Sequence, residues 1–181
     1  MIHMGKIITI GREFGSGGRE VGKRLSDELG IAYYDNEIIT EIAKRTELAE
    51  GYVQHVMENG PTALMPITIG RTLQELAEKS DCVIVGRSAD YILRDKKPLR
   101  LFIYADMESR MERCRKRAPE QEHFTDKELR RHIQDVDKRR SKYYQFFTGQ
   151  TWGEKLNYDL CINTSGANIE DLVKVIAKLV K

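Results

Sequence analysis

The sequence predicts an α/β protein in which helices cover both faces of a parallel sheet. Short apolar runs typical of buried strands alternate along the chain with longer segments of helical periodicity. Strands that alternate with helices pair in parallel, because each helix carries the chain back across the sheet. The 181 residues contain no internal repeat and no low-complexity linker, so we predict one domain over residues 1–181.

The first half of the chain contains three of the strand-like runs. Val21, Leu25 and Leu29 recur every four residues and predict an amphipathic helix that ends at Gly30. In order, we expect a strand at 6–10, this helix, a strand at 31–34, a helix carrying Ile38, Ile39, Ile42 and Ala43, a helix at 50–58, a loop at 61–66, a helix carrying Ile69, Leu73, Leu76 and Ala77, and a strand at 82–85.

The second half of the chain adds two strands and the most clearly capped helix. Thr125 and Glu128 form the pattern of a capping box at the start of a long helix. In order, we expect a short helix at 90–94, a strand at 99–104, an arginine-rich helix at 106–117, a polar loop at 118–124, the long helix from 125 to about 144, a loop at 146–157, a strand at 158–163, and a final helix that Asn168 caps.

A glycine-rich segment joins the first strand to the first helix. Gly11, Gly15, Gly17 and Gly18 fall within eight residues. Glycines let backbone N–H groups approach a phosphate closely, and the N-terminus of the following helix favours negative charge. Strand, glycine loop and helix together predict phosphate binding by Gly15, Ser16, Gly17, Gly18, Arg19 and Glu20. The alternative is a glycine-rich turn that binds nothing.

This loop departs from the pattern G-x-x-x-x-G-K-[ST], because no lysine follows its last glycines. If Gly17 is the last glycine of the pattern, Gly18 stands at the lysine position. If Gly18 is the last, Arg19 replaces the lysine and Glu20 replaces Ser/Thr. We prefer the second register, which keeps a cation beside the β- and γ-phosphates. Ser16 is then a loose substitute for the missing hydroxyl that would bind magnesium.

Composition excludes several other classes of protein. The cysteines Cys82, Cys114 and Cys161 are widely spaced without a CxxC pattern, which indicates neither a metal site nor a disulfide and fits a cytoplasmic protein. Cys82 and Cys161 lie in strand-like runs, where we expect core residues. No apolar run is long enough to span a membrane, and no signal peptide is evident. A net charge of +2 is too small to indicate nucleic-acid binding.

Charged residues follow other predicted strands. In a doubly wound sheet the ligand lies at the carboxyl ends of the strands, so these residues should converge with the glycine loop. Arg87 ends a buried run and is a candidate to bind a phosphate, unless it pairs with a structural carboxylate. Asp35 follows the second strand, where it binds a substrate hydroxyl or simply caps a helix.

The helices at 106–117 and 125–144 carry many basic residues. Phosphoryl transfer needs cations that stabilise charge on the phosphate oxygens, and two helices joined by a loop are suited to supply them as a closing lid. The basic cluster comprises Arg110, Arg113, Arg115, Lys116 and Arg117 on the first helix and Lys138, Arg139 and Arg140 on the second. Alternatives are a solvated basic face or RNA binding, although seven acidic residues interleave with the basic ones.

The chain resembles the cytidylate kinase-like family, a branch of the P-loop nucleoside monophosphate kinases, over nearly its whole length. The matching segments are residues 10–20, Leu29-Gly30 through Tyr34-Asp35, Val85-Gly86-Arg87, Asp137-Lys138-Arg139-Arg140 with Tyr143-Tyr144, and residues 158–164. The resemblance implies a three-layer αβα P-loop fold, a five-stranded parallel sheet of order 2-3-1-4-5, and a helical lid at about 107–142. Val85 and Ser88 stand where true cytidylate kinases carry two aspartates.

The resemblance also implies a function. We expect transfer of the γ-phosphoryl group of ATP, with Mg²⁺, to a small acceptor such as the nucleoside monophosphate CMP. Arg19, Arg87, Arg113, Arg117 and Arg139 would act in catalysis, and Asp35 and Arg87 would bind the acceptor. The alternatives are a kinase for another small metabolite, or a nucleotide-binding module without catalysis, which the missing lysine favours.

Overall fold

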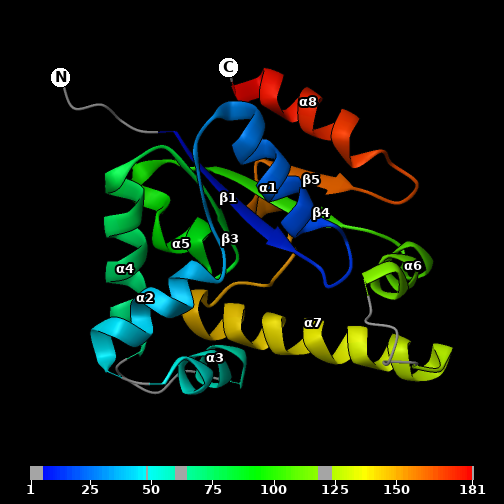
Figure 1. Ribbon diagram of the computed structural model, residues 1–181, viewed down its shortest axis with the longest axis horizontal. Coiled ribbons are helices and arrows are strands. Elements are labelled where there is room, and N and C mark those ends of the chain that lie inside the picture. The colour runs from blue at the N-terminus through cyan, green and yellow to red at the C-terminus, as the bar shows by residue number, and fades with distance from the viewer. Residues whose placement is uncertain (1–5, 48, 60–64, 118–123, 181) are drawn as a thin grey trace.

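Five parallel strands form one sheet in the order β2-β3-β1-β4-β5. The computed structural model describes residues 6–47, 49–59, 65–117 and 124–180 (Figure 1). The strands are β1 (Ile7–Arg12), β2 (Ala32–Tyr34), β3 (Cys82–Val85), β4 (Leu99–Tyr104) and β5 (Leu160–Asn163). The predicted fold and strand order are confirmed.

Helices cover both faces of the sheet, as expected. They are α1 (Gly18–Leu29), α2 (Glu37–Thr46), α3 (Glu50–Asn59), α4 (Met65–Lys79), α5 (Ala89–Ile92), α6 (Met107–Arg117), α7 (Asp126–Thr148) and α8 (Ile169–Val180), with short 3₁₀ turns at Arg94–Lys96 and Lys155–Asn157. Figure 1 shows α1 beside α8, and α2, α4 and α5 grouped together. Among the described residues, no helix combines the length and the apolar composition that crossing a membrane requires.

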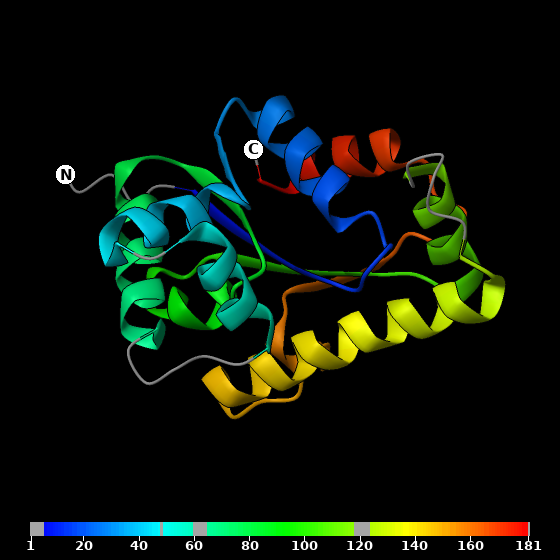
Figure 2. The same cartoon turned by 60° about the horizontal axis from the view of Figure 1, so that its bottom comes forward.

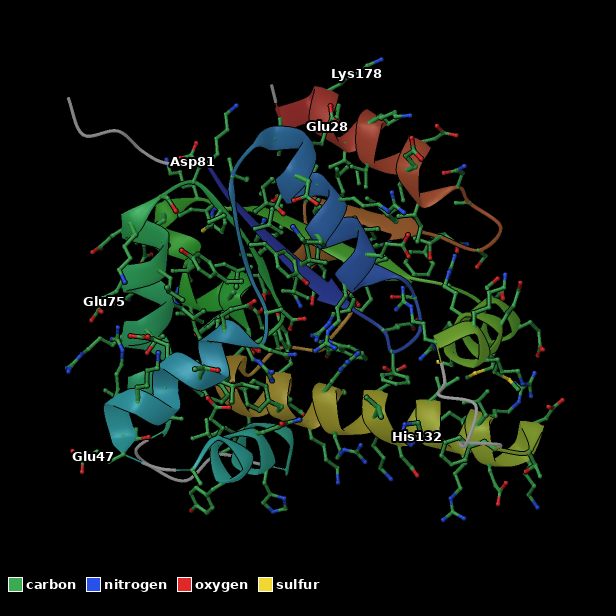
Figure 3. The ribbon with its side chains drawn as sticks, viewed as in Figure 1. Glu28, Glu47, Glu75, Asp81, His132 and Lys178 are labelled. Carbon is green, nitrogen blue, oxygen red and sulfur yellow. The ribbon has the colours of Figure 1, made fainter. Side chains whose placement is uncertain are left out.

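Side-chain alternation along the strands divides the core in two. Ile8 and Ile10 of β1 pack with Val21 and Leu25 of α1 and with residues of α8. Ile7, one position earlier, packs with residues of α2 and α4 on the other face. Successive side chains of a strand point to opposite faces, so a strand buried on both faces is apolar at nearly every position. Charged side chains such as Glu47 and Lys178 point outward (Figure 3).

Several predicted boundaries were wrong. The loop at 61–66 overlaps α4, which begins at Met65, since Pro66 in a first helical turn removes no hydrogen bond; residues 61–64 lie outside the described residues. The long helix continues past 144 to Thr148, where Gly149 ends it with a φ of 68°. The last strand begins at Leu160 rather than 158. The expected loop at 118–124 lies outside the described residues except for its last position.

Cys161 was also wrongly predicted. Cys82 is buried in the central strand β3, as expected, whereas Cys161 is exposed. It lies on β5, which is the edge strand of the sheet. An edge strand can leave one face uncovered, and every second residue of β5 is exposed.

The helices α6 and α7 form a separate packing unit beside the sheet. Met111 of α6 packs on Leu129 and Ile133 of α7, with Phe14 of the glycine loop against them. The predicted capping box is present, because Thr125 accepts a hydrogen bond from the backbone of Glu128 and the Glu128 carboxylate accepts one in return. Figures 1 and 2 show α7 running past the end of the sheet to which the β1 arrow points. Basic residues of both helices therefore lie close to the carboxyl ends of the strands.

Candidate nucleotide site

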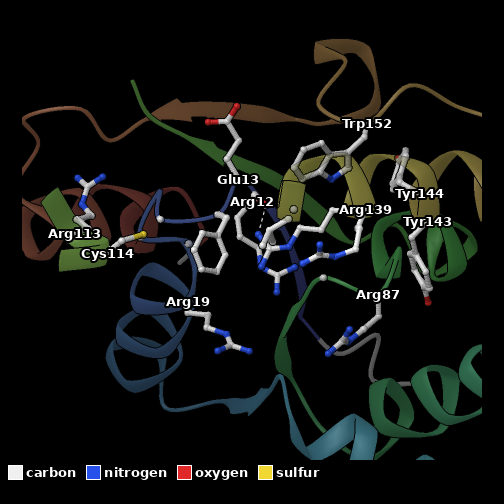
Figure 4. A pocket seen from close by; sticks show the side chains of 18 of the residues that line it. Arg12, Glu13, Arg19, Arg87, Arg113, Cys114, Arg139, Tyr143, Tyr144 and Trp152 are labelled. Carbon is white, nitrogen blue, oxygen red and sulfur yellow. Dashed lines mark hydrogen bonds between the residues drawn. The ribbon is translucent and has the colours of Figure 1, made fainter. Parts of the chain in front are cut away.

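A cavity of about 630 Å³ lies at the carboxyl ends of β1 and β3. Its walls come from the glycine loop, the turn after β3, α6, α7 and the segment that follows α7. Among the described residues, the charged groups lining it are mostly cationic: Glu13 and Asp90 are the acids, and the arginines are Arg12, Arg19, Arg87, Arg113, Arg117, Arg139 and Arg140. Figure 4 shows Arg12, Arg19, Arg87 and Arg139 around one space. The charge of this cavity suits an anion.

The glycine loop has the geometry of an anion site. Gly17 is the residue before α1 and has a φ of 86°, and Val21 N–H donates to its carbonyl at 2.9 Å. A side chain at Gly15 would meet the Arg110 carbonyl at 2.9 Å, and one at Gly17 would meet Ile169 at 2.7 Å. Glycine is therefore required at both positions, and Gly15, Gly17 and the first residues of α1 line the cavity.

Arg110 of α6 and Asp137 of α7 connect these two helices to the glycine loop. Arg110 Nε donates to the Phe14 carbonyl at 2.7 Å, and the Phe14 N–H donates to Asp137 at 2.8 Å. Arg110 also forms ion pairs with Asp137 and with Glu13, and its side chain is almost completely buried. Burial raises the pKa of Glu13 above its ordinary value. Arg110, part of the basic cluster seen in the sequence, is thus a structural residue.

The predicted lid residues differ in what they contact. Arg113 Nη2 donates to the carbonyl of Thr164 at 2.5 Å, and Nη1 donates to the carbonyl of Ser16 at 3.4 Å. Arg113 therefore links the glycine loop to the segment that follows β5. Arg117 on α6 pairs with Glu20 on α1 at 3.1 Å. Arg139 lines the cavity from α7. All three lie at the cavity wall, as the sequence predicts, and their roles with a ligand stay predictions.

Arg19 and Asp35 are brought together directly. Arg19 Nε lies 2.6 Å from Asp35 Oδ2, and Arg19 Nη2 donates to Asn36 at 3.0 Å. Asp35 is buried, whereas half of the Arg19 side chain is exposed. Arg19 lies at the second position of α1, beyond the first glycine of the helix. The phosphate contact expected for Arg19 remains a prediction, and its contact in the protein is a carboxylate.

Arg87 stands in an unusual backbone conformation. Gly86, Arg87 and Ser88 have φ values of 78°, 61° and 53°, which places three consecutive residues in the left-handed region. That region is costly for residues with a side chain, by about 1–3 kcal/mol each, and it concentrates at functional sites. The Nε atom of Arg87 is buried and has no hydrogen-bond partner among the described residues. The strained turn thus places at the cavity an arginine whose buried Nε atom is unpaired among the described residues, and the phosphate contact of Arg87 stays a prediction.

Aromatic residues close the cavity around a buried acid. Asp90 on α5 accepts a hydrogen bond from the Tyr144 hydroxyl at 2.7 Å. Burial raises the pKa of Asp90, and the bond from Tyr144 opposes that rise. Trp152 packs edge-on against Phe102, with 5.4 Å between the ring centroids. This region offers a flat apolar wall with one polar group, which suits a ring-shaped ligand.

Sequence reasoning missed Arg12, Arg140 and Asp90 as site residues. In the sequence, Arg12 lies within the glycine-rich segment, where the glycines are the stronger signal, although it is the first charged residue after a buried apolar run. Arg140 stood in a run of three basic residues with nothing to distinguish it from its neighbours. Asp90 lies in a short helix, where an exposed acid would be ordinary. Among the described residues, no group of His, Cys, Asp and Glu is arranged to hold a metal ion.

Comparisons with known proteins find relatives over most of the chain. A profile of the cytidylate kinase-like family matches residues 7–166. A cytidylate kinase of Methanopyrus kandleri is 29% identical over 175 residues, which cover 91% of this chain and 88% of that protein. One of Archaeoglobus fulgidus is also 29% identical, over 96% of this chain and 94% of that protein.

Solved structures share the fold. An uncharacterised protein from Eubacterium ventriosum is 30% identical with a TM-score of 0.78, and the match covers 97% of this chain and 98% of that one. Shikimate kinase from Bacteroides thetaiotaomicron is 20% identical with a TM-score of 0.62, and the match covers 96% and 97% of the two chains. The second likeness shows the fold alone.

Proposed function

The chain belongs to the cytidylate kinase-like family, and from this premise we propose that it transfers the γ-phosphoryl group of ATP to a nucleoside monophosphate such as CMP. One observation carries the proposal: arginines from the glycine loop, the turn after β3, α6 and α7 converge on a single cavity. Phosphoryl transfer depends on positioning and on cations around the transferred group. Both substrates are anions that such a cavity would bind.

The glycine loop forms the donor side of the proposed site. The N–H groups at Gly15–Gly18 and the N-terminus of α1 bind the ATP phosphates, with Ser16 and Glu20 at the edge of the loop. The side chains of Arg113 and Arg117 approach from α6. Arg113 is fixed to the Ser16 carbonyl, so a movement of α6 would be transmitted to the loop. The pair α6–α7 would act as the lid, within a single domain.

Magnesium would be held mainly by the oxygens of ATP and by water. The nearest carboxylate of the loop, Glu13, is engaged by Arg110 and by the N–H of Ala105. The Ser16 hydroxyl donates to the Glu13 carbonyl at 2.8 Å, and Ser16 is completely buried and does not line the cavity, so it does not fit the role of a magnesium ligand. The ion would supply charge neutralisation between the β- and γ-phosphates.

The acceptor side lies toward β2 and β3. Arg87 binds the phosphate of the monophosphate, because its guanidinium is held at the cavity and no carboxylate of the described residues pairs with it. Asp35 binds the sugar or the base, with Arg19 orienting its carboxylate. Arg139 neutralises the group in transfer. Both substrates are intracellular metabolites, which suits the cytoplasmic location that we expect from the sequence.

The proposal is tested by measuring ADP release with ATP, Mg²⁺ and each of several nucleoside monophosphates. We expect turnover with at least one pyrimidine monophosphate, and CMP first among them. Turnover only with a phosphate-free metabolite would indicate a kinase for another small molecule. No turnover with any acceptor, together with no ATP binding in calorimetry, would overturn the proposal.

A second candidate is a nucleotide-binding module without catalysis. One observation favours it, namely that no lysine occupies the glycine loop. The same two assays separate the candidates, because a binding module would take up ATP in calorimetry and release no ADP with any acceptor.

A further inference from the structure

We propose that Arg12 supplies the cation that an ordinary loop of this kind takes from its lysine, and that Gly18 occupies the lysine position so that the Arg12 side chain can pass. This inference rests on the proposed function and assigns a further residue to the donor side of the site. It also selects between the two registers that the sequence left open. The assignment follows from the path of one side chain.

The path begins at the first turn of α1. Arg12 is the last residue of β1, and Gly18 is the first residue of α1. A Cβ atom at Gly18 would lie 2.4 Å from Arg12 Cβ and 2.7 Å from Arg12 Cγ. Contacts below 3.0 Å essentially never occur at a real Cβ, so the stem of Arg12 fills the space that a side chain at position 18 would need. A lysine side chain at position 18 and the Arg12 side chain in its observed position cannot both be accommodated.

The path ends beside the turn after β3. A Cβ atom at Gly86 would lie 2.3 Å from Arg12 Nη1. Two glycines distant in sequence therefore leave room for one arginine, the first for its stem and the second for its guanidinium. The guanidinium lies in the cavity near Arg139 (Figure 4). The Arg12 carbonyl accepts a hydrogen bond from Arg140 at 3.1 Å, which anchors the backbone from which the side chain departs.

The guanidinium of Arg12 has no ion-pair partner in the part of the chain that the structure describes. None of the ion pairs among the described residues includes Arg12, and its Nε atom is buried without a hydrogen bond. Its charged neighbours are mostly cations: burial, followed by the charges of Arg140 and Arg87, lowers the pKa of Arg12 well below its ordinary value, while Asp35 opposes this. A buried cation among cations is stabilised by an anion, and a phosphate accepts paired hydrogen bonds from a guanidinium.

The helix boundary supports the same register. In the pattern G-x-x-x-x-G-K-[ST] the last glycine precedes the lysine at the start of the helix. Here Gly17 is the residue before α1 and has a positive φ, so Gly18 is the following position. The lysine position is then a glycine, and Arg12 reaches the phosphates from the opposite side of the loop. Arg19 is left for its contact with Asp35.

The first test measures ATP and AMP affinity by calorimetry, with Mg²⁺ and without an acceptor. Arg12→Met keeps the stem and removes the charge, and we expect ATP affinity to fall on the order of 10- to 100-fold. AMP, which lacks the β- and γ-phosphates, should lose less than about threefold. Arg12→Lys should stay within about threefold of the unmodified protein for both ligands. Arg45→Met is the control, since Arg45 pairs with Glu41 and Glu75 away from the cavity.

The second test moves the cation. Arg12→Gly removes the Cβ and Cγ atoms that exclude a side chain at position 18. The double variant Arg12→Gly with Gly18→Lys restores the glycines and the lysine of the ordinary pattern, with Arg19 still at the Ser/Thr position. We expect the double variant to bind ATP at least tenfold more tightly than Arg12→Gly alone. Gly18→Lys alone should weaken ATP binding, because its side chain displaces Arg12. Thermal unfolding of each variant establishes that it is folded.

The outcomes separate this inference from the proposed function. If the unmodified chain binds no ATP, the proposed function itself fails. If it binds ATP and Arg12→Met binds equally well, the proposed function stands and the assignment of Arg12 is overturned. A folded double variant that binds ATP no better than Arg12→Gly overturns the assignment of Gly18 to the lysine position. A loss with Arg12→Lys as large as with Arg12→Met would show that charge is not what Arg12 provides, and overturns the inference too.

Discussion

Arg19 Nε lies 2.6 Å from Asp35 Oδ2, so the first turn of α1 is joined to the end of β2 by an ion pair. The pair is uneven, because the Asp35 side chain is 6% exposed and that of Arg19 is 51% exposed. A buried carboxylate requires a partner, whereas a half-exposed arginine does not. The pair therefore serves mainly to hold the Asp35 carboxylate in one orientation on the acceptor side of the cavity.

Arg19→Ala tests this relationship. We expect the free energy of unfolding to fall by about 1–3 kcal/mol, because the buried Asp35 carboxylate loses its partner. The KM for the monophosphate should rise severalfold, because Asp35 loses its orienting partner, while ATP affinity changes less than about threefold. Steady-state kinetics and calorimetry measure the two effects. A tenfold loss of ATP affinity would contradict this and would place Arg19 at the β- and γ-phosphates.

Gly86→Ala should weaken ATP binding in addition to the loss of stability that its left-handed backbone conformation causes. Position 86 has a φ of 78°, and a Cβ atom added there would lie 2.3 Å from Arg12 Nη1, so an added methyl group would both strain the backbone and displace the guanidinium. Gly30→Ala is the matched control, with a φ of 66° and no atom within 4 Å. We expect each variant to lose about 1–2 kcal/mol of stability from the left-handed backbone. Only Gly86→Ala should also lose ATP affinity, and an equal loss in both would contradict the account.

Asp137→Asn should be strongly destabilising. Asp137 accepts hydrogen bonds from Phe14 N–H and from Arg110, whose side chain is 7% exposed. Removing the charge leaves the buried Arg110 guanidinium with Glu13 as its remaining ion-pair partner among the described residues, at a cost of about 3 kcal/mol. Urea unfolding measures the change. The control is Asp126→Asn, which breaks a pair between the same two helices at an exposed position and should cost about 1 kcal/mol or less. Similar losses in both variants would refute the structural role of Asp137.

Asp90 should make stability depend on pH. Burial raises its pKa in the folded protein, so folding favours the protonated form. The stabilisation is complete below the unfolded pKa of about 4 and is lost as pH rises through the higher folded pKa. The difference in unfolding free energy between the unmodified protein and Asp90→Asn should therefore decrease as pH rises over that window. A difference that stays constant with pH, or that grows, would show that the pKa of Asp90 is not raised.

The sequence by itself determined the layered fold and the position of the glycine loop. Alternation of apolar strands with periodic helices is a local signal, and so is the capping box at Thr125 and Glu128. The left-handed conformation of Gly17 and the helix start behind it are also local, because a glycine permits a positive φ whatever surrounds it. The predicted ends of helices and strands were less accurate than the predicted elements themselves, because the end of a helix such as α7 depends on how its last turn packs.

Only the tertiary structure decided which groups each arginine contacts. In the sequence, Arg12, Arg19, Arg110 and Arg139 are equivalent cations, and long side chains can reach many places from one backbone position. The structure pairs Arg110 with Asp137, pairs Arg19 with Asp35, and directs Arg12 into the cavity between Gly18 and Gly86. Each of these contacts joins segments that are distant along the chain or on separate elements. The position of an arginine guanidinium depends on how far it is removed from water and on the space available to the aliphatic part of its side chain. Both conditions exist only after the distant segments have come together.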